Sequence, residues 1–187
     1  KICHSADVVH AAANEWASGE PQAQPRPAGP SLADTRAWVA RLHEGQSDKA
    51  GVPYMRHVER VAAIHARLFP EADLAERHAA WLHDAIEDTG VTAEVLAARG
   101  YPAATIAIVE AVTKPVDGRS TYAQRIDGLI ARGLAGAVRV KIADLTDNLD
   151  EDRLAHLPAE FAAAARRRYG QARARLLAAL DHLTAHG

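Results

Sequence analysis

The sequence predicts an all-α protein, and three of its features support that prediction. From Ser31 onward, apolar residues recur at helical spacing, and no segment alternates convincingly between apolar and polar residues as a half-buried strand does. Short apolar groups such as residues 134–138 fit a helix equally well. Alanine, the strongest helix former, dominates these segments. Glycines and prolines separate several of them, which gives each helix a place to begin or end.

The expected helices follow one another along the chain. Pro53 suits the first turn of the second helix, and Pro70 ends that helix because proline lacks the N–H group that a further turn needs. Gly90, Gly100 and Gly118 stand where helix C-caps or turns are expected. The predicted helices span about residues 32–44, 54–68, 71–87, 92–98, 102–113, 119–132, 135–149 and 158–185, and the last allows a break near Gly170.

Composition indicates one globular domain with an extension before it. The 187 residues are 48% hydrophobic and 25% charged, as is usual for a folded domain. Residues 19–30 contain four prolines, so we expect an extended linker there, with residues 1–30 as an N-terminal extension and 31–187 as the folded domain. The single cysteine, Cys3, excludes an internal disulfide and fits a cytoplasmic protein.

Charge and hydropathy argue against two classes of partner. The chain has 22 Lys and Arg residues against 24 Asp and Glu residues, and its net charge of −2 gives no general attraction to nucleic acid or to an anionic membrane surface. No apolar run approaches the roughly 20 residues that span a bilayer. Nothing in the sequence identifies a partner protein, so we expect any phosphate chemistry to come from a local site.

The segment 80–90, AWLHDAIEDTG, is the most informative in the chain. On one continuous helix, His83, Asp84, Glu87 and Asp88 would lie within an arc of about 140°. A solvated helix face is the ordinary explanation for such a cluster. However, the acids would occupy the C-terminal turns, where the helix dipole already favours cations. We therefore expect a bound metal ion, or a cation brought by folding, beside this face.

Two further segments extend the cluster. In residues 138–150, Lys141, Asp144 and Asn148 form a polar line beside an apolar stripe, although Asp144 alone would more often be a surface acid paired with Lys141. His57 lies one turn before Val61 and is expected to face inward, where a lone histidine is usually a core residue. Two imidazoles and two carboxylates from three helices would nevertheless suit Mn²⁺, Fe²⁺, Co²⁺ or Zn²⁺, with positions left open for water.

The order of His57, the pair His83 and Asp84, and then Asp144 resembles the H…HD…D signature of the HD-domain metal-dependent phosphohydrolases. Residues 43–57, HEGQSDKAGVPYMRH, resemble the HxGQ…KxGxPYxxH opening of the RelA/SpoT-type alarmone hydrolases. The blocks HDAIEDT at 83–89 and VKIADLTDNL at 140–149 resemble two more of their motifs. The resemblance covers about residues 34–152 and implies an all-α HD-domain fold without a synthetase domain.

The resemblance also implies roles for single residues. One divalent metal ion, which we expect to be Mn²⁺, would be bound by four side chains: His57, His83, Asp84 and Asp144. Glu87 and Asp88 would activate water. Lys49, Lys141 and Asn148 would contact the nucleotide.

The expected reaction is removal of the 3′-diphosphate from a (p)ppGpp-like alarmone. Asp48 stands where the family usually carries an arginine that packs on guanine. This difference favours one alternative, a phosphatase for another nucleotide such as a deoxynucleotide, an adenosine alarmone or NADPH. A second alternative is a catalytically idle module that senses a nucleotide or neutralises a toxin by binding. The retained acids Glu87 and Asp88 argue against the idle module.

Overall fold

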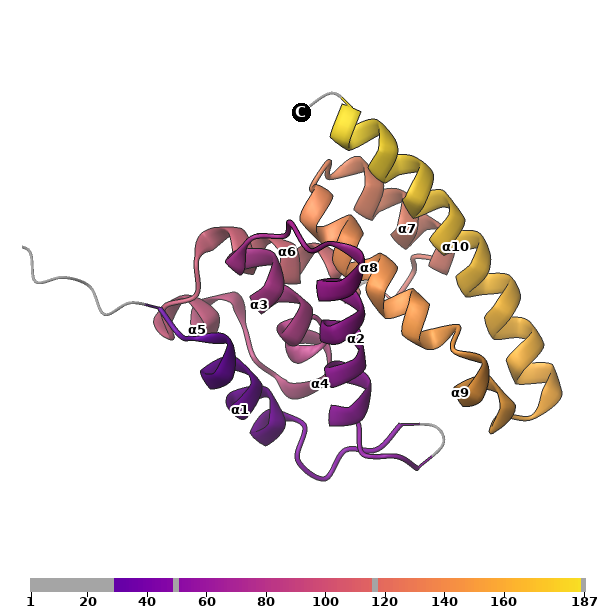
Figure 1. The fold of residues 1–187 in the computed structure, drawn as a ribbon, viewed down its shortest axis with the longest axis horizontal. Helices are drawn as coiled ribbons and strands as arrows, with labels where there is room; N and C mark the ends of the chain where they lie inside the picture. Colours follow the sequence, from indigo (N-terminus) through magenta and orange to yellow (C-terminus); the bar gives the residue numbers. More distant parts are fainter. Residues whose placement is uncertain (1–28, 49–50, 116–117, 186–187) are drawn as a thin grey trace, which may run out of the picture.

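The computed structural model describes residues 29–48, 51–115 and 118–185, and these residues form an all-helical fold (Figure 1). The prediction of the fold class is therefore confirmed. The expected extension before residue 29 lies outside the described residues. The helices are α1 (Leu32–Leu42), α2 (Met55–Leu68), α3 (Leu74–Leu82), α4 (Ala85–Thr89), α5 (Ala93–Ala98), α6 (Ala103–Val112), α7 (Tyr122–Ala131), α8 (Ala135–Asn148), α9 (Glu151–Ala155) and α10 (Ala159–Ala185).

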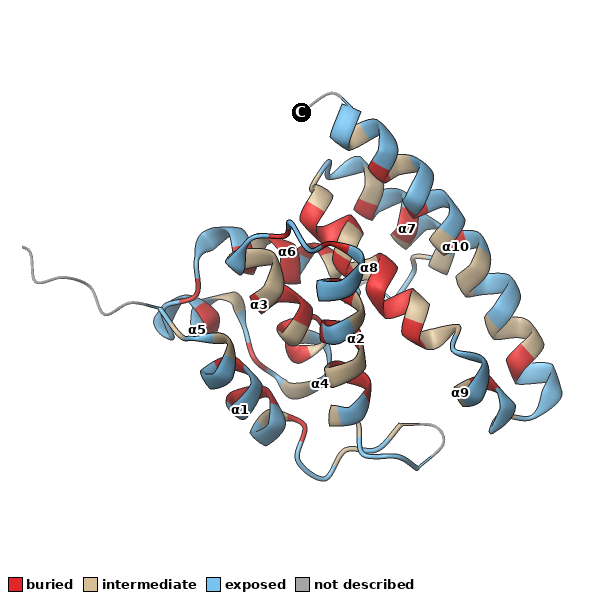
Figure 2. Cartoon of the chain, viewed as in Figure 1, coloured by how far each residue is buried: buried red, intermediate tan, exposed pale blue. Residues whose placement is uncertain are grey.

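Helix α8 is the central element of the fold. It packs against α2 on one side and against the long α10 on the other, and α3 and α6 complete its surroundings (Figure 1). Its predicted apolar residues Val138, Ile142 and Leu145 are buried, and Figure 2 shows most of the helix in the buried class. Each such side chain stabilises the fold by about 1.5–3 kcal/mol. The polar line of α8 is thus held in a fixed position inside the protein.

The structure differs from the predicted helices in three places. Residues 71–87 do not form one helix, because the chain turns at His83 and Asp84 between α3 and α4. A short helix that periodicity did not indicate, α9, begins at the N-cap Asp150, whose side chain accepts a hydrogen bond from the Arg153 N–H. Helix α10 continues through Gly170, because its buried residues Ala172 and Leu176 pack into the core on the far side of that glycine.

The loop between α1 and α2 folds back on itself. Ser47 and Pro53 form a single antiparallel bridge, and the Asp48 N–H donates to the Val52 carbonyl at 2.8 Å. Asp48 Oδ1 also accepts from the Val52 N–H at 3.0 Å. These bonds fix the part of the loop that precedes α2 and bring Asp48 toward α9. Within the described parts of the chain, none of the helices combines the length and the apolarity that crossing a membrane would require.

Candidate metal centre

The turn between α3 and α4 directs His83 and Asp84 to the same place. Asp84 has φ −106° and ψ 0°, outside the helical range, and it is the N-cap of α4. The His83 Nε2 and Asp84 Oδ2 atoms are 2.8 Å apart, whereas neighbours on a continuous helix diverge by about 100°. The expectation that Asp84 lies in the C-terminal turns of one long helix is therefore wrong, because Asp84 is the N-cap of α4. Glu87 and Asp88 lie within α4, which has five residues, so its first turn is also its last.

Side chains from three helical segments meet at this turn. His57 from α2, His83, and Asp144 from α8 each offer one ligand atom, and these atoms lie within 4.8 Å of one another. The two Nε2 atoms are 3.4 Å apart, and His57 Nε2 is 3.5 Å from Asp144 Oδ1. Asp84 Oδ2 lies 3.6 Å from His57 Nε2 and receives a hydrogen bond of 2.5 Å from Tyr54. The four residues predicted to bind a metal therefore do converge.

The Nδ1 atom of each imidazole has a hydrogen-bond partner, and these partners orient the two rings. His83 Nδ1 lies 3.0 Å from the Ala80 carbonyl, and His57 Nδ1 lies 2.6 Å from Asp147 Oδ2. These acceptors suit a proton on each Nδ1, so both Nε2 atoms face the cluster. A histidine that binds a metal characteristically has such a partner on its other nitrogen.

The carboxylates give the cluster an affinity for positive charge. Burial lowers the pKa of His57, but the hydrogen bonds to Asp147 and Asp84 outweigh this effect and raise the pKa to about 9. Burial likewise lowers the pKa of His83, and the negative charge of Asp84 raises it above its usual value. Burial raises the pKa of Asp84, whereas the charge of His83 lowers it to well below its usual value. The same field that holds protons here would attract a metal cation.

Asp147 is a part of the site that sequence analysis missed. Its side chain is 1% exposed and, besides His57, it binds Arg60 Nε at 2.5 Å and Arg153 Nη1. Burial raises the pKa of Asp147, but the hydrogen bonds from His57 and Arg60 lower it to about 2, so the group is ionised. Its spacing of three residues from Asp144, one helical turn, was the available signal.

The polar line of α8 surrounds Asp144 as the sequence suggested. Lys141 Nζ is 2.8 Å from Asp144 Oδ2, and Asn148 Nδ2 donates to Asp144 Oδ1 at 2.6 Å. Asp144 is 5% exposed, so the alternative of an ordinary surface acid is wrong. Burial lowers the pKa of Lys141, but the negative charge of Asp144 raises it above its usual value, so the lysine stays charged.

Asp88 lies at the rim of the cluster, whereas the other acid of α4, Glu87, has a different partner. Burial and the charge of Asp84 raise the pKa of Asp88, which marks Asp88 as a near neighbour of the cluster. Glu87 instead accepts a hydrogen bond from the backbone N–H of Lys114 at 3.1 Å. The Asp88 carbonyl accepts from Gln46 Nε2 at 3.1 Å, which ties the rim to the loop before α2.

Asp48 and Lys49, the two other residues that the sequence singled out, belong to the segment before α2. Lys49 is outside the described residues, so its expected substrate contact stays a prediction. Asp48 Oδ2 is 3.2 Å from Arg153 Nη2. Arg153 thus joins Asp48 to Asp147, and Asp147 joins both to His57. Sequence spacing gave no signal for this link, because it connects residues 105 positions apart.

The donor set fits a divalent metal ion. Two imidazole nitrogens and two carboxylates are typical ligands for such ions, and their partners at the outer atoms are in place. The fold and the site together define an all-helical protein with a buried His/Asp centre suited to a divalent metal. The chain belongs to the HD-domain family, since the family model described as "HD domain" matches residues 35–180.

The individual proteins that resemble this chain include two curated relatives and one solved structure. Two curated relatives, from Vibrio cholerae and Haemophilus influenzae, are each 34% identical over 119 residues, which is 59% of this chain. Both are named guanosine-3′,5′-bis(diphosphate) 3′-pyrophosphohydrolase, and the chain covers 16% and 17% of their length. A solved structure of a metazoan ortholog of SpoT, described as hydrolysing ppGpp and acting in starvation responses, has a TM-score of 0.57 and 25% identity. The match covers 82% of this chain and 94% of that one.

Proposed function

We propose that this protein is a metal-dependent phosphohydrolase that removes the 3′-diphosphate from (p)ppGpp-like alarmones, with Mn²⁺ as its metal. The observation that carries the proposal is the convergence of His57, His83, Asp84 and Asp144 at one buried point. The names of the bacterial relatives and the description of the metazoan structure support the substrate class. The family match supports the metal dependence.

The metal ligands in this proposal are these four residues. A divalent ion there would supply a nucleophile at neutral pH and positive charge beside the phosphoryl group. His57 and His83 would each present Nε2 as a ligand. Asp147 and the Ala80 carbonyl hold the two rings in the required orientation by their contacts with Nδ1. Lys141 and Asn148 hold the two oxygens of Asp144.

Proton transfer is assigned to Asp88, with Glu87 as the second member of the pair. The raised pKa of Asp88 brings it closer to the range in which a carboxylate accepts a proton effectively. In the reaction, a bond forms between the water oxygen and the phosphorus, and the bond between that phosphorus and the 3′ oxygen breaks. Asp88 takes the proton from water, and this proton ends on the 3′ oxygen. The products are the 3′-hydroxyl nucleotide and free diphosphate.

The substrate contacts follow from the remaining polar groups. Lys141 would offset charge on the phosphates, since the negative charge of Asp144 keeps it protonated despite its burial. Asn148 already donates one N–H to Asp144, so its amide oxygen and second N–H would contact the sugar or the 3′-phosphate. Lys49 would add a further charge from the loop before α2.

A nucleotide panel tests the proposal. The Mn²⁺-loaded protein is incubated with ppGpp, its adenine counterpart, deoxynucleoside triphosphates and NADPH, and the release of pyrophosphate and of orthophosphate is scored separately. Pyrophosphate release from ppGpp is expected, and it should vanish in Asp84→Ala. Binding of ppGpp without turnover of any nucleotide would favour the idle sensing module.

A phosphatase for another nucleotide is the second candidate, and Asp48 favours it. The carboxylate of Asp48 is engaged by the Val52 N–H and by Arg153, so this position offers no guanidinium plane for a guanine base. We therefore expect a weaker preference for guanine over adenine than in relatives with arginine here. Orthophosphate release from NADPH or a deoxynucleotide, without cleavage of either 3′-diphosphate, would make the second candidate the function.

A further inference from the structure

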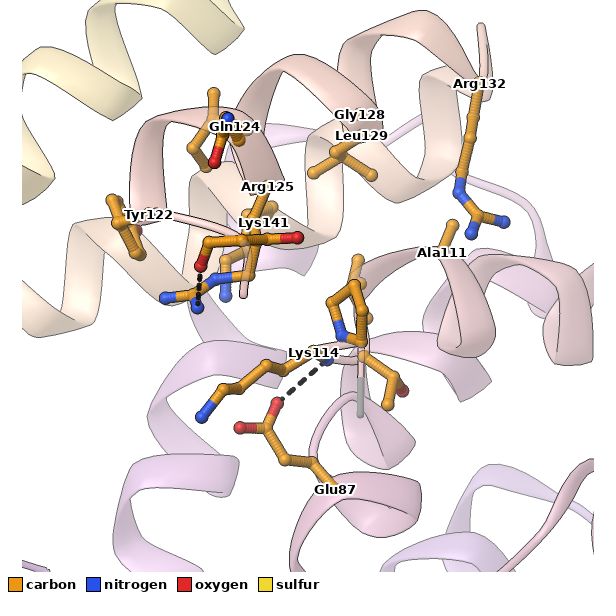
Figure 3. Close-up of a pocket in the computed structure, with 15 residues that line it drawn as sticks. Glu87, Ala111, Lys114, Tyr122, Gln124, Arg125, Gly128, Leu129, Arg132 and Lys141 are labelled. Atoms are coloured by element: carbon orange, nitrogen blue, oxygen red, sulfur yellow. Dashed lines mark hydrogen bonds between the residues drawn. The ribbon is translucent and has the colours of Figure 1, made fainter. Parts of the chain in front are cut away.

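A cavity of about 370 Å³ lies between α4, α6, α7 and α8 (Figure 3). Its volume lies within the usual range for small-ligand sites. Glu87 and Lys141 line it, and Lys141 Nζ also lies 2.8 Å from Asp144 Oδ2 of the metal centre. Lys141 therefore joins the cavity to the metal centre.

The lining of the cavity is strongly cationic. Lys114, Arg125, Arg132 and Lys141 contribute positive charges, and Glu87 is the one carboxylate among the lining residues that the structure describes. The charge of Glu87 faces the Lys114 N–H, and Lys141 is paired with Asp144. The guanidinium groups of the two arginines are left as donors in a fork geometry that suits phosphate oxygens.

Two of the lining groups are oriented before any ligand arrives. Arg125 Nη1 donates to the Ser120 carbonyl at 3.2 Å, and its guanidinium lies 5.4 Å from the centre of the Tyr122 ring. The Tyr122 hydroxyl is buried without a hydrogen-bond partner among the described residues. Burial raises the pKa of Tyr122 to about 12, so the hydroxyl remains a donor. A buried donor without an acceptor is destabilising, and a phosphate oxygen would supply the missing acceptor.

We propose that this cavity binds the outer phosphate of the diphosphate group whose inner phosphate is attacked at the metal centre. The proposal rests on the proposed function for the identity of the attacked group. A nucleobase would need acceptors as well as donors, whereas this lining offers mainly donors and positive charge. The cavity thus makes the protein select a diphosphate over a monophosphate, and it holds free diphosphate after cleavage.

Calorimetry with inorganic pyrophosphate and orthophosphate tests the subsite without any turnover. Both ions are titrated into the Mn²⁺-loaded wild type, Arg125→Gln and Arg132→Gln. Either substitution should weaken pyrophosphate binding about tenfold while changing orthophosphate binding little, because only the outer phosphate reaches the cavity. Arg167→Gln, which removes an exposed charge on α10, is the matched control and should change neither.

Arg132 keeps the test decisive if Arg125→Gln disturbs the fold, because Arg132 is an exposed residue at the end of α7. An unchanged ratio of pyrophosphate to orthophosphate affinity in Arg132→Gln would overturn the subsite. An equal loss for both ions would also overturn it and would indicate a general charge effect. If the ratio falls as expected but no 3′-diphosphate is hydrolysed, the subsite stands and the proposed function fails. If ppGpp is hydrolysed with an unchanged ratio, only the subsite fails.

Discussion

Helix α3 holds the buried His78 at its middle and ends at the buried C-cap residue His83, and the surroundings of the two histidines differ. His78 contacts Thr35 Oγ1 at 2.9 Å, and Thr35 in turn contacts the Tyr101 hydroxyl at 2.9 Å. All the partners there are neutral, and burial lowers the pKa of His78. His83, at the C-terminal end of α3, lies among carboxylates, and the charge of Asp84 raises its pKa. Burial alone therefore does not indicate a metal site; the charge of the neighbours decides between a core histidine and a ligand.

The largest expected effect comes from removing a ligand. His83→Ala or Asp84→Ala should reduce metal content to background and abolish hydrolysis, because the remaining donors cannot hold the ion. The stabilisation that added Mn²⁺ gives to the wild type should disappear as well. Metal analysis and thermal unfolding with and without Mn²⁺ check this prediction.

His78→Asn is the matched control for that experiment, since it also replaces a buried histidine of α3. It should retain full metal content. If Asp84→Ala kept full occupancy, the assignment of the centre would be wrong, and if His78→Asn lost the metal, the contrast between His78 and His83 would be wrong.

Removal of the proton acceptor should have the next largest effect. Asp88→Asn or Glu87→Gln is expected to leave the metal in place and to lower turnover by about two orders of magnitude or more, as is typical when a general base is lost. Asp88→Asn should have the larger effect, because the charge of Asp84 helps to raise the pKa of Asp88, whereas the Glu87 carboxylate is engaged by the Lys114 N–H. Glu110→Gln, on the exposed face of α6, is the control. Normal turnover in both variants at saturating Mn²⁺ would show that the acceptor lies elsewhere.

A smaller effect is expected from the residue behind His57. Asp147→Asn preserves size but removes the charge that orients His57, so the affinity for Mn²⁺ should fall by about 10–100-fold. A competition titration against a metal-binding dye measures this affinity independently of activity. Asp152→Asn, an exposed acid on α9, should bind Mn²⁺ as the wild type does. Wild-type affinity in Asp147→Asn would leave Asp147 with a purely structural role.

The fold and the four clustered residues could be predicted from the sequence because both are marked by patterns of a few neighbouring residues. Helical periodicity and punctuation indicate the helices, and short motifs mark His57, His83, Asp84 and Asp144. The turn at His83 could not be predicted this way, since a helical pattern runs through it without glycine or proline. Asp147 was missed for a different reason: its partners His57 and Arg60 lie 90 and 87 positions away in the sequence, so only the folded structure brings them to it.

The smallest expected effect concerns His78 and is one of stability alone. The folded state disfavours protonated His78, so the unfolded state takes up the proton first as pH falls below about 6.5. The contribution of His78 to stability is therefore complete above that pH and declines below it, by at most about 1.4 kcal/mol per pH unit. Tyr101 does not titrate in this range, because burial raises its pKa above the ordinary value.

His78→Asn cannot titrate, so the difference in unfolding free energy between wild type and variant should shrink from pH 7.5 to pH 5.5. Urea denaturation with a chelator present in both samples measures this difference, and the titration of His57 and His83 then cancels in the comparison. Hydrolysis by the Mn²⁺-loaded variant should remain close to wild type. A difference that stays constant or grows toward pH 5.5 would mean that His78 is held in its charged form. His78 and His83 would then have the same kind of surroundings, and charge would no longer distinguish the ligand from the core histidine.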